Sequence, residues 1–555
     1  MTAARVPEHT VSDHILERLR AWGVAHVFGC AGAGIGGLLA AWARAGDEPH
    51  FLRAGHEKSA AFEAIGYAKF SGHVGVCAAG SGPGAVQLLN GLYDARLDQV
   101  PVVALIGRAG PGDGGTPGQE AALFEDAVGA GPQTVGAPGD LPEVLDRAVR
   151  TAYARRAPTA VVIPADVQDL AFPPTGHAHR LVASSLDASG GDPVPRTRSV
   201  ERAAEILNSG DRVALLIGQG AAQAAAEVAE VAELLGAGVA KSLLAKDALS
   251  DLLPYVTGCV GPLGTRPSYE LMRTCDTLLT IGSGFPYAQF LPPYGQARAV
   301  RIDVDPRPVG PRYPYEADLV GDAAPTLRAL LPLLRPVRDR SWQEGVVRDV
   351  RRWKTAMARR AGLRGDPVNP EYVAHALDLL LPGDAMITAD SGPVATWYAR
   401  HLTMRDGMRG TLSGTLASTG CAVPYAVGAK FAHPDRPAVA LVDDAAVREN
   451  GLAELAAIAE HAGEWTDPRL IVAVWNTGEP CTDLARSLGV AGIRVTDPGG
   501  VEDAWRTALA TDGPTVLDFR TDPEVAPIAP HAPWDHFEAT AAPLTGTGPA
   551  AVPSP

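Results

Sequence analysis

Short apolar segments alternate with helical stretches along almost the whole chain, and this alternation restricts the fold more than any other feature. Strands that are buried on both faces of a parallel sheet form continuous apolar runs, and helices connect them. The pattern therefore predicts the α/β class, with doubly wound parallel sheets. The strand candidates are AHVFGC, GVCAAGS, PVVALIG, TAVVIPA, VALLIG, DTLLTIG, AVRIDVD, DAMITAD, AVALVDD, RLIVAVWN and TVLDFR.

The length of 555 residues exceeds what one hydrophobic core can organise. Interruptions of the alternation divide the strand candidates into three groups, so we predict three domains. A linker rich in Pro, Gly and Ser follows the first domain, a charged linker helix follows the second, and a tail rich in Pro and Ala follows the third. The predicted bounds are 1–171, 199–335 and 369–530 for the domains, 172–198 and 336–368 for the linkers, and 531–555 for an irregular tail.

The composition excludes several classes of function. A net charge of -15 and a pI near 5.4 disfavour nucleic-acid binding, so we expect a small-molecule substrate. The six cysteines occur singly, without CxxC pairs, and are predicted to be buried small side chains. His9, Asp13 and Glu17 stand where a secretory signal would be apolar, and there is no apolar run of about 18 residues. We therefore expect a cytoplasmic protein without membrane attachment.

Glu57 is the first candidate site residue. It begins a helical stretch, AGHEKSAAFEAIGYAKFSG, that also contains Glu63, and the next strand candidate leads into SGPGA with Gly82. A glutamate at a helix start is favoured by the helix dipole and can simply face solvent. Alternatively, partial burial raises the pKa of such a carboxyl, which can then share a proton with a ligand nitrogen. The residues alone leave both interpretations open.

The segment HEKSAAFEAIGYAKFSGHVGVCAAGSGPGAVQLLNGLYDARLDQVPVVALIG resembles the pyrimidine-binding domain of thiamine-diphosphate enzymes of the pyruvate oxidase and acetolactate synthase type. The likeness is greatest to pyruvate oxidase and quinone-linked pyruvate dehydrogenase members, and it covers nearly the whole chain. It implies that Glu57 hydrogen-bonds N1′ of the aminopyrimidine and so promotes proton loss from thiazolium C2, with Gly82 at the cofactor. It also implies that Gln119, in GTPGQEAALFED, reaches the reacting carbonyl.

The third domain carries the candidate diphosphate site. Asp443 and Asp444 end one strand candidate, and Asn476 ends the next. From the residues alone, a strand-end aspartate is more often a turn or helix cap than a ligand. The resemblance aligns Asp443-Asp444-Ala445 with the Gly-Asp-Gly motif of the family. It implies that Mg²⁺ binds Asp444, Asn476 and the carbonyl of Gly478, because a diphosphate needs a hard cation held by oxygen ligands.

Two further segments, DSG and LSGTLAST, match the phosphate side of the family site, although a generic loop rich in Ser and Gly would look the same. The cofactor contacts that the resemblance implies are Glu57, Gly82, Ser391, Gly392, Ser418, Thr419, Gly420, Asp443, Asp444, Ala445 and Asn476.

Several positions depart from the family pattern. Asp443 adds a carboxylate beside the diphosphate, and Ala445 adds a Cβ where glycine allows close backbone approach. Thr419 stands where a bulky apolar residue supports the bent cofactor, and Trp475 replaces an asparagine. These departures keep open the hypothesis of a catalytically weakened or silent homologue with a structural or regulatory role.

The middle segment DTLLTIGSGFPYAQFLPPYGQARAVRIDVDPRPVGPRYPYEADLVGD resembles the FAD-binding domain of pyruvate oxidase relatives. FAD is therefore a further candidate cofactor. Gly218, Gly220 and Asp305 serve equally well as turn residues.

The resemblance as a whole implies an enzyme that decarboxylates a small 2-oxo acid, pyruvate by default, to an enamine, followed by carboligation or aldehyde release. Such an enzyme is a lyase or a transferase. A FAD-dependent pyruvate oxidase or dehydrogenase is the alternative. In this family the Glu57 half and the Asp444 half of a site belong to different subunits, so we expect at least a homodimer and commonly a homotetramer.

Overall fold

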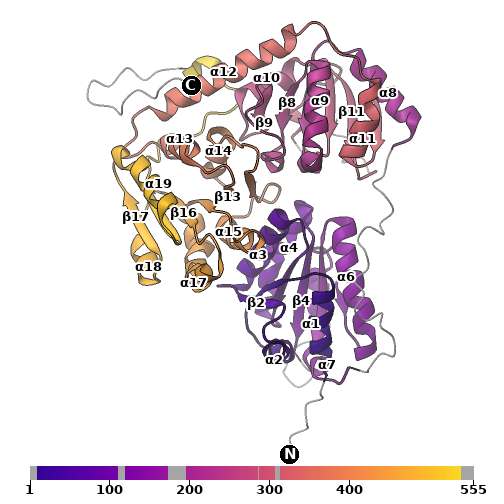
Figure 1. Ribbon diagram of the computed structural model, residues 1–555, viewed down its shortest axis with the longest axis vertical. Helices are drawn as coiled ribbons and strands as arrows, with labels where there is room; N and C mark the ends of the chain where they lie inside the picture. Colours follow the sequence, from indigo (N-terminus) through magenta and orange to yellow (C-terminus); the bar gives the residue numbers. More distant parts are fainter. Residues whose placement is uncertain are drawn as a thin grey trace, which may run out of the picture.

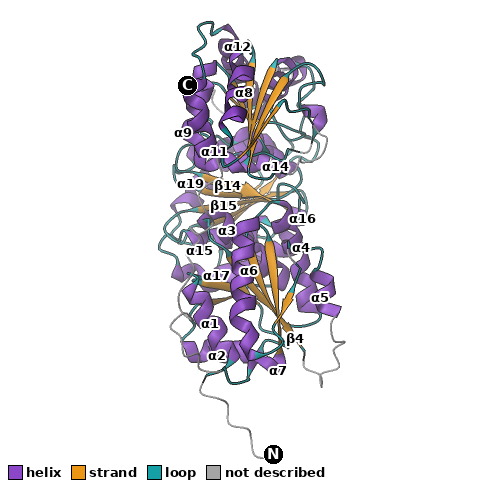
Figure 2. Cartoon of the chain, turned by 90° about the vertical axis from the view of Figure 1, so that its right-hand side faces the viewer, coloured by secondary structure: helices purple, strands orange, loops and turns teal. Residues whose placement is uncertain are grey.

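A computed structural model describes residues 9–109, 119–129, 131–172, 195–285, 287–306 and 313–538. Figure 1 shows three bodies, with the third domain between the first and the middle one, and Figure 2 shows the same order from the side. Each body has a six-stranded sheet in which every pair of neighbouring strands is parallel. The predicted α/β class with three doubly wound sheets is confirmed.

The first domain has the strand order β2-β1-β3-β4-β6-β5. Strands β3, β4 and β6 are almost entirely buried, because helices cover both faces of the sheet (Figure 2). The strands are β1 (His26–Gly29), β2 (His50–Arg53), β3 (Gly75–Ala79), β4 (Val102–Arg108), β5 (Gln133–Thr134) and β6 (Pro158–Pro164). The helices are α1 (Val11–Ala21), α2 (Gly36–Ala45), α3 (Glu57–Ser71), α4 (Pro83–Leu97), α5 (Gln119–Phe124), α6 (Leu141–Arg155) and α7 (Ala165–Gln168).

The middle domain has the order β12-β11-β10-β7-β8-β9. Strands β8 and β9 therefore follow on one side of β7, and β10 to β12 follow on its other side, so the strand order switches between β7 and β10. The strands are β7 (Val213–Ile217), β8 (Gly238–Lys241), β9 (Val256–Cys259), β10 (Thr277–Ile281), β11 (Arg298–Asp303) and β12 (Ala317–Val320). The helices are α8 (Thr197–Asn208), α9 (Ala225–Leu235), α10 (Arg266–Thr274) and α11 (Ala323–Leu330), followed by the linker helix α12 (Ser341–Ala361).

The third domain repeats the strand pattern of the first, in the order β14-β13-β15-β16-β18-β17. The strands are β13 (Met386–Ala389), β14 (Arg409–Leu412), β15 (Ala438–Asp443), β16 (Leu470–Asn476), β17 (Ala491–Val495) and β18 (Thr515–Arg520). The helices are α13 (Pro370–Leu380), α14 (Pro393–His401), α15 (Ala422–Ala432), α16 (Asp444–Ala446), α17 (Leu452–His461), α18 (Thr482–Ser487) and α19 (Val501–Ala510).

Helix α3 of the first domain packs directly against α15 of the third, and the two lie side by side in Figure 1. Glycines allow the two backbones to approach closely. A Cβ on Gly66 would lie 2.6 Å from Cα of Tyr425, and a Cβ on Gly428 would lie 2.6 Å from the amide nitrogen of Tyr67. Side chains of that size would force the helices apart, so these glycines set the spacing of the two domains.

A buried charge cluster fastens the middle domain to the third. The carboxylate of Asp251 lies 2.6 Å from Nζ of Lys241 and 3.0 Å from Nζ of Lys246. Lys246 also donates to the carbonyl of Leu402, and the amide of Met404 donates to Asp251. The two ammonium groups hold the pKa of Asp251 down, at about 2, in spite of its burial.

The segment after the third domain was expected to be irregular, but the structure has a helix there, α20 (Trp534–Glu538). Phe537 packs edge-on against Trp353 of α12, with ring centroids 5.1 Å apart, and this contact stabilises the helix. The cysteines have no disulfides; Cys30 is half-buried, and the other five are buried, as predicted. No helix in the described ranges has the length and apolar character that a bilayer span requires.

Candidate functional site

The strand order of the third sheet creates a crevice between β13 and β15. The chain moves outward from β13 to one side and from β15 to the other, so the loops after these two strands diverge. In open α/β sheets, ligands bind at this switch point, outside the carboxyl ends of the strands. The loop after β13 contains Ser391 and Gly392, and β15 ends at Asp443, so the sequence candidates lie at the expected edge.

Asp443 caps the short helix α16. Its Oδ1 accepts a hydrogen bond from the amide of Ala446 at 2.8 Å, the helix-cap role that a strand-end aspartate commonly takes. Its other oxygen lies against Gly392, where an added Cβ would be 3.1 Å away. Burial, followed by the charge of Asp444, raises the pKa of Asp443. The extra carboxylate is therefore part of the local fold of the crevice.

Asp444, Asn476 and Gly478 come together at the ends of β15 and β16. An added Cβ on Gly478 would lie 2.9 Å from Oδ2 of Asp444, and Thr477 contacts the same oxygen at 3.4 Å. Oδ1 of Asn476 accepts from the amide of Gly478 at 2.7 Å, and its Nδ2 donates to the carboxylate of Asp518. A carboxylate from the end of β15 therefore lies beside an amide oxygen and a carbonyl from the end of β16.

This donor set fits a hard divalent cation, because all three groups offer oxygen. The carbonyl of Gly478 already accepts from Nη1 of Arg520 at 2.6 Å, which leaves its second lone pair for a cation. Nη2 of Arg448 lies near the same glycine, 2.7 Å from the position of an added Cβ. Two guanidinium groups thus add positive charge where a diphosphate is expected.

The loop before α15 links this crevice to the first domain. The hydroxyl of Thr419 lies 3.2 Å from that of Ser391, and Ser418 donates to Asn90 of α4. The amide of Gly420 donates to both oxygens of Asp390, at 2.9 and 3.0 Å. Burial raises the pKa of Asp390 to about 7, and the charge of Asp443 adds to the effect. The loop conformation therefore depends on a buried aspartate.

Glu57 is the first residue of α3 and is half-buried. His56 caps the helix by accepting from the amide of Lys58. Oε1 of Glu57 lies against the start of α4, 2.8 Å from the position of a Cβ on Gly84. Gly82, with φ of 67°, makes the left-handed turn that brings α4 to this point. The carboxylate thus lies against the glycine turn at the start of α4.

Glu57 and the predicted metal ligands belong to different domains of the chain. In the part of the chain that the structure describes, no hydrogen bond or ion pair joins Glu57 to Asp444 or Asn476. The backbone of Gln119 begins α5, but its side chain lies outside the described residues, so its predicted role stays a prediction. Ala445 is exposed at the mouth of the crevice.

Comparisons with known proteins match each of the three domains. The N-terminal TPP binding domain of thiamine pyrophosphate enzymes matches residues 9–127, their central domain matches residues 200–330, and their C-terminal TPP binding domain matches residues 390–476. A putative thiamine pyrophosphate-containing protein, YdaP, of Bacillus subtilis (strain 168) is 30% identical over 92% of this chain and 91% of its own length. The chain belongs to the thiamine pyrophosphate enzyme family.

Two other relatives of this thiamine pyrophosphate enzyme have more specific names. Pyruvate oxidase of Lactiplantibacillus plantarum is 29% identical over 78% of this chain and 72% of its own length. The acetolactate synthase large subunit of Corynebacterium glutamicum is 29% identical over 84% of this chain and 79% of its own length. The family predicted from the sequence is confirmed.

Trp475 of this thiamine pyrophosphate enzyme does not face the diphosphate crevice. Its indole donates to the carbonyl of Pro370 at 3.0 Å and packs in the core with Phe519. Since side chains alternate along a strand, Trp475 and Asn476 point to opposite faces of the sheet. The difference from the family pattern at Trp475 therefore affects packing of the core. The alternation of side chains along β16 would have predicted this.

Sequence reasoning missed a buried carboxyl pair that joins α3 to α17. Glu63 and Glu454 are both fully buried, and Glu454 accepts from the amide of Gly55 at 3.2 Å. Burial, with the charge of Glu454 next in importance, raises the pKa of Glu63 well above its ordinary value. Burial also raises the pKa of Glu454. Two carboxyl groups that touch in a dry site are expected to share a proton.

A cavity of about 930 Å³ lies among the three domains, at the switch point of the middle sheet between β7 and β10. Loops after β7, β10 and β11 line it, together with Gln99 of the first domain and Ser391 and Gly392 of the third. Gly218 lies in close contact with the next loop, since an added Cβ would be 2.5 Å from Cα of Ser283. The amide of Asp305 donates to Asp303 at 3.0 Å. Both residues thus form turns, and these turns shape the cavity.

Proposed function

We propose that this chain is a thiamine-diphosphate- and Mg²⁺-dependent enzyme that decarboxylates a small 2-oxo acid, with carboligation or aldehyde release as the second step. The observation that carries the proposal is that Asp444, Asn476 and Gly478 lie at the carboxyl ends of β15 and β16, beside the switch point of a sheet that belongs to a cofactor-binding domain. The names of the relatives, pyruvate oxidase and acetolactate synthase, support pyruvate as the substrate to test first.

When bound, thiamine diphosphate supplies a carbon nucleophile for the keto carbon and takes up the electron pair that departing carbon dioxide leaves. Glu57, whose carboxylate lies beside Gly84, would hold a proton at N1′ of the pyrimidine. Asp444, Asn476 and Gly478 hold Mg²⁺, and Arg448 and Arg520 add charge that attracts the diphosphate.

We also propose that a second copy of the chain completes each site. Within one chain, Glu57 lies against α4 of its own domain. The residues that flank Glu57 in the sequence contact the third domain: Gly55 donates to Glu454, and Lys58 forms an ion pair with Glu449. A homodimer is then the smallest active unit, and a homotetramer is consistent with the proposal. Mass photometry of the purified chain tests this, because a monomer that turns over substrate would contradict it.

The test of the main proposal is calorimetric titration of the metal-stripped chain with thiamine diphosphate and Mg²⁺, followed by assay of carbon dioxide release from pyruvate and other 2-oxo acids. Glu57→Gln should abolish turnover and leave the thermal unfolding midpoint unchanged. Glu143→Gln is the matched control, because Glu143 is an exposed glutamate in the first turn of α6. Full turnover in Glu57→Gln would refute the role of this carboxylate.

A flavin-dependent oxidase or dehydrogenase is the second candidate, and the cavity at the switch point of the middle sheet favours it. An absorbance spectrum of the purified chain decides between the candidates, because bound FAD colours the protein yellow. Absence of magnesium-dependent cofactor binding would instead favour a silent homologue.

A further inference from the structure

A buried histidine near the start of α1 has a ring nitrogen without a partner. The side chain of His14 is 1% exposed; its Nε2 has no hydrogen-bond partner within the described residues, and its Nδ1 has a long contact with Glu17. The ring stacks on Phe172, with centroids 3.8 Å apart and planes 10° from parallel. A buried polar group of this kind is rare unless something outside the protein chain satisfies it.

Two further donors face the same point. Nδ1 of His14 lies 3.5 Å from Oε2 of Glu17, and Nε2 of His9 lies 3.7 Å from the same oxygen. All three donor atoms lie within 4.8 Å of one another. In a tetrahedral zinc site with ligand bonds of about 2.0–2.2 Å, the ligand atoms are separated by roughly 3.3–3.6 Å. The distance from His14 to Glu17 lies within this range, and that from His9 to Glu17 is about 0.1 Å longer.

The backbone holds these side chains in place. His14 and Glu17 are one turn apart on α1, so they share a face of the helix. The carbonyl of His9 accepts from the amide of Phe172 at 3.0 Å, and Thr10 forms a bridge with Ala171. Because both segments are fixed, little further ordering is needed for binding.

The local charges also suit a cation. The nearest guanidinium, that of Arg18, is paired with Asp146 through two hydrogen bonds, one of 2.6 Å and one of 2.5 Å. Imidazole and carboxylate together are a ligand set that zinc and its neighbours in the first transition series favour over Mg²⁺.

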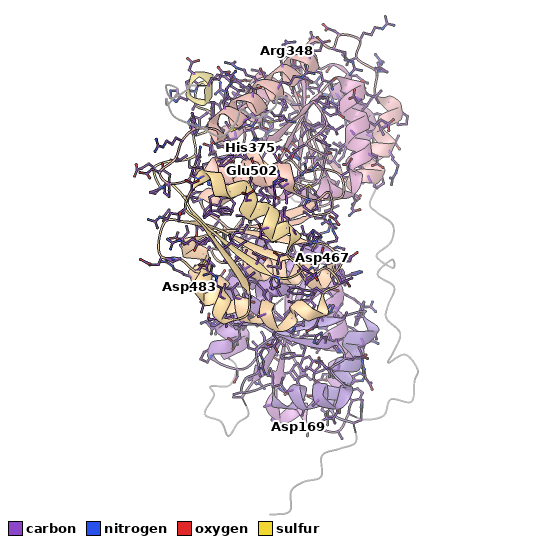
Figure 3. All side chains as sticks on the ribbon, turned by 60° about the vertical axis from the view of Figure 1, so that its left-hand side comes forward. Asp169, Arg348, His375, Asp467, Asp483 and Glu502 are labelled. Atoms are coloured by element: carbon purple, nitrogen blue, oxygen red, sulfur yellow. The ribbon has the colours of Figure 1, made fainter. Side chains whose placement is uncertain are left out.

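We propose that His9, His14 and Glu17 bind a divalent transition-metal ion of the zinc type, with a fourth position open to water. The three ligands come from α1 and the residue before its cap, and His14 also stacks on Phe172 at the end of the first domain. Figure 3 labels Asp169 at this end of the first domain, far from the third domain, and Figure 1 places α7 at the same end. The proposed ion is therefore distinct from the Mg²⁺ of the proposed cofactor site.

The test is titration of the metal-stripped full chain with Co²⁺ in excess Mg²⁺, which fills sites made only of oxygen donors. We expect one Co²⁺ per chain and the visible absorption bands of a tetrahedral ion. Glu17→Gln and His9→Ala, both at partly exposed positions, should weaken Co²⁺ binding by at least about tenfold. His73→Ala is the matched control, because His73 is exposed and lies elsewhere in the first domain, and it should bind like the wild type.

Thermal melts supply a second readout. Zn²⁺ should raise the unfolding midpoint of the wild type and of His73→Ala, and leave that of Glu17→Gln unchanged. His14→Ala is less informative alone, since its ring is buried against Phe172. Failure of the wild type to bind Co²⁺, or equal binding by Glu17→Gln and His9→Ala with unaltered folds, would overturn the proposal.

Discussion

Replacing Gly66 by alanine is expected to weaken the contact between α3 and α15. The added methyl would lie 2.6 Å from Cα and 2.9 Å from the carbonyl carbon of Tyr425, where ordinary contacts begin near 3.4 Å. Both neighbours are helix backbone and cannot rotate away. Such overpacking lowers the free energy of unfolding by about 1–3 kcal/mol. The higher helix propensity of alanine offsets up to about 1 kcal/mol of this loss. Taking the upper end of the overpacking range, we expect a net destabilisation of about 2 kcal/mol.

Gly36→Ala is the matched control. Gly36 is also a helix residue, at the start of α2, but nothing lies within 4 Å of its added Cβ. This change should stabilise the chain by about 0.4–1 kcal/mol. In differential scanning calorimetry, a loss of about 2 kcal/mol in a unit of domain size lowers the midpoint by roughly 4–8 °C. An unchanged or raised midpoint for Gly66→Ala would refute the argument that backbone contact sets the spacing of the two domains.

Two further changes test buried charges. Asp251→Ala leaves the ammonium groups of Lys241 and Lys246 buried without their carboxylate. We expect the free energy of unfolding, measured by thermal melts, to fall by about 3–5 kcal/mol. A loss below about 1 kcal/mol would contradict this argument. Asp390 has a pKa raised to about 7, so from about pH 4 to 7 the folded chain holds a proton that the unfolded chain releases. Unfolding free energy should then fall with rising pH, by up to about 1.4 kcal/mol per unit. Asp390→Asn should reduce that slope in melts at stepped pH, and an identical slope would exclude Asp390 as its source.

The central strands were predictable from the sequence, and several edge strands were not. Strands β3, β4 and β16 form continuous apolar runs because helices cover both of their faces. β2 and β17 lie at or beside a sheet edge, are short and are partly exposed, so they lack that signal. A strand can be predicted from its residue types when both of its faces are buried.

The candidate site was predictable where its residues end a strand. Asp443 and Asn476 follow apolar runs directly, so their common edge could be expected. The contact of Arg520 with the carbonyl of Gly478 was not predictable, because it depends on the register that pairs β16 with β18. The pairing of Glu63 with Glu454 likewise depends on how two separate domains pack, which neither local sequence contains.

The contact of α3 with the third domain has a consequence for synthesis of the chain on the ribosome. Gly55 hydrogen-bonds Glu454, 399 residues later in the sequence, and almost the whole surface of α3 is buried in the finished molecule. At about 5–20 residues per second, roughly 20–80 s pass before the partner emerges. During this interval the first domain has its strands and helices but exposes an apolar helix face. We therefore expect chaperones to bind the nascent chain, and expression to depend on their supply and on the rate of elongation.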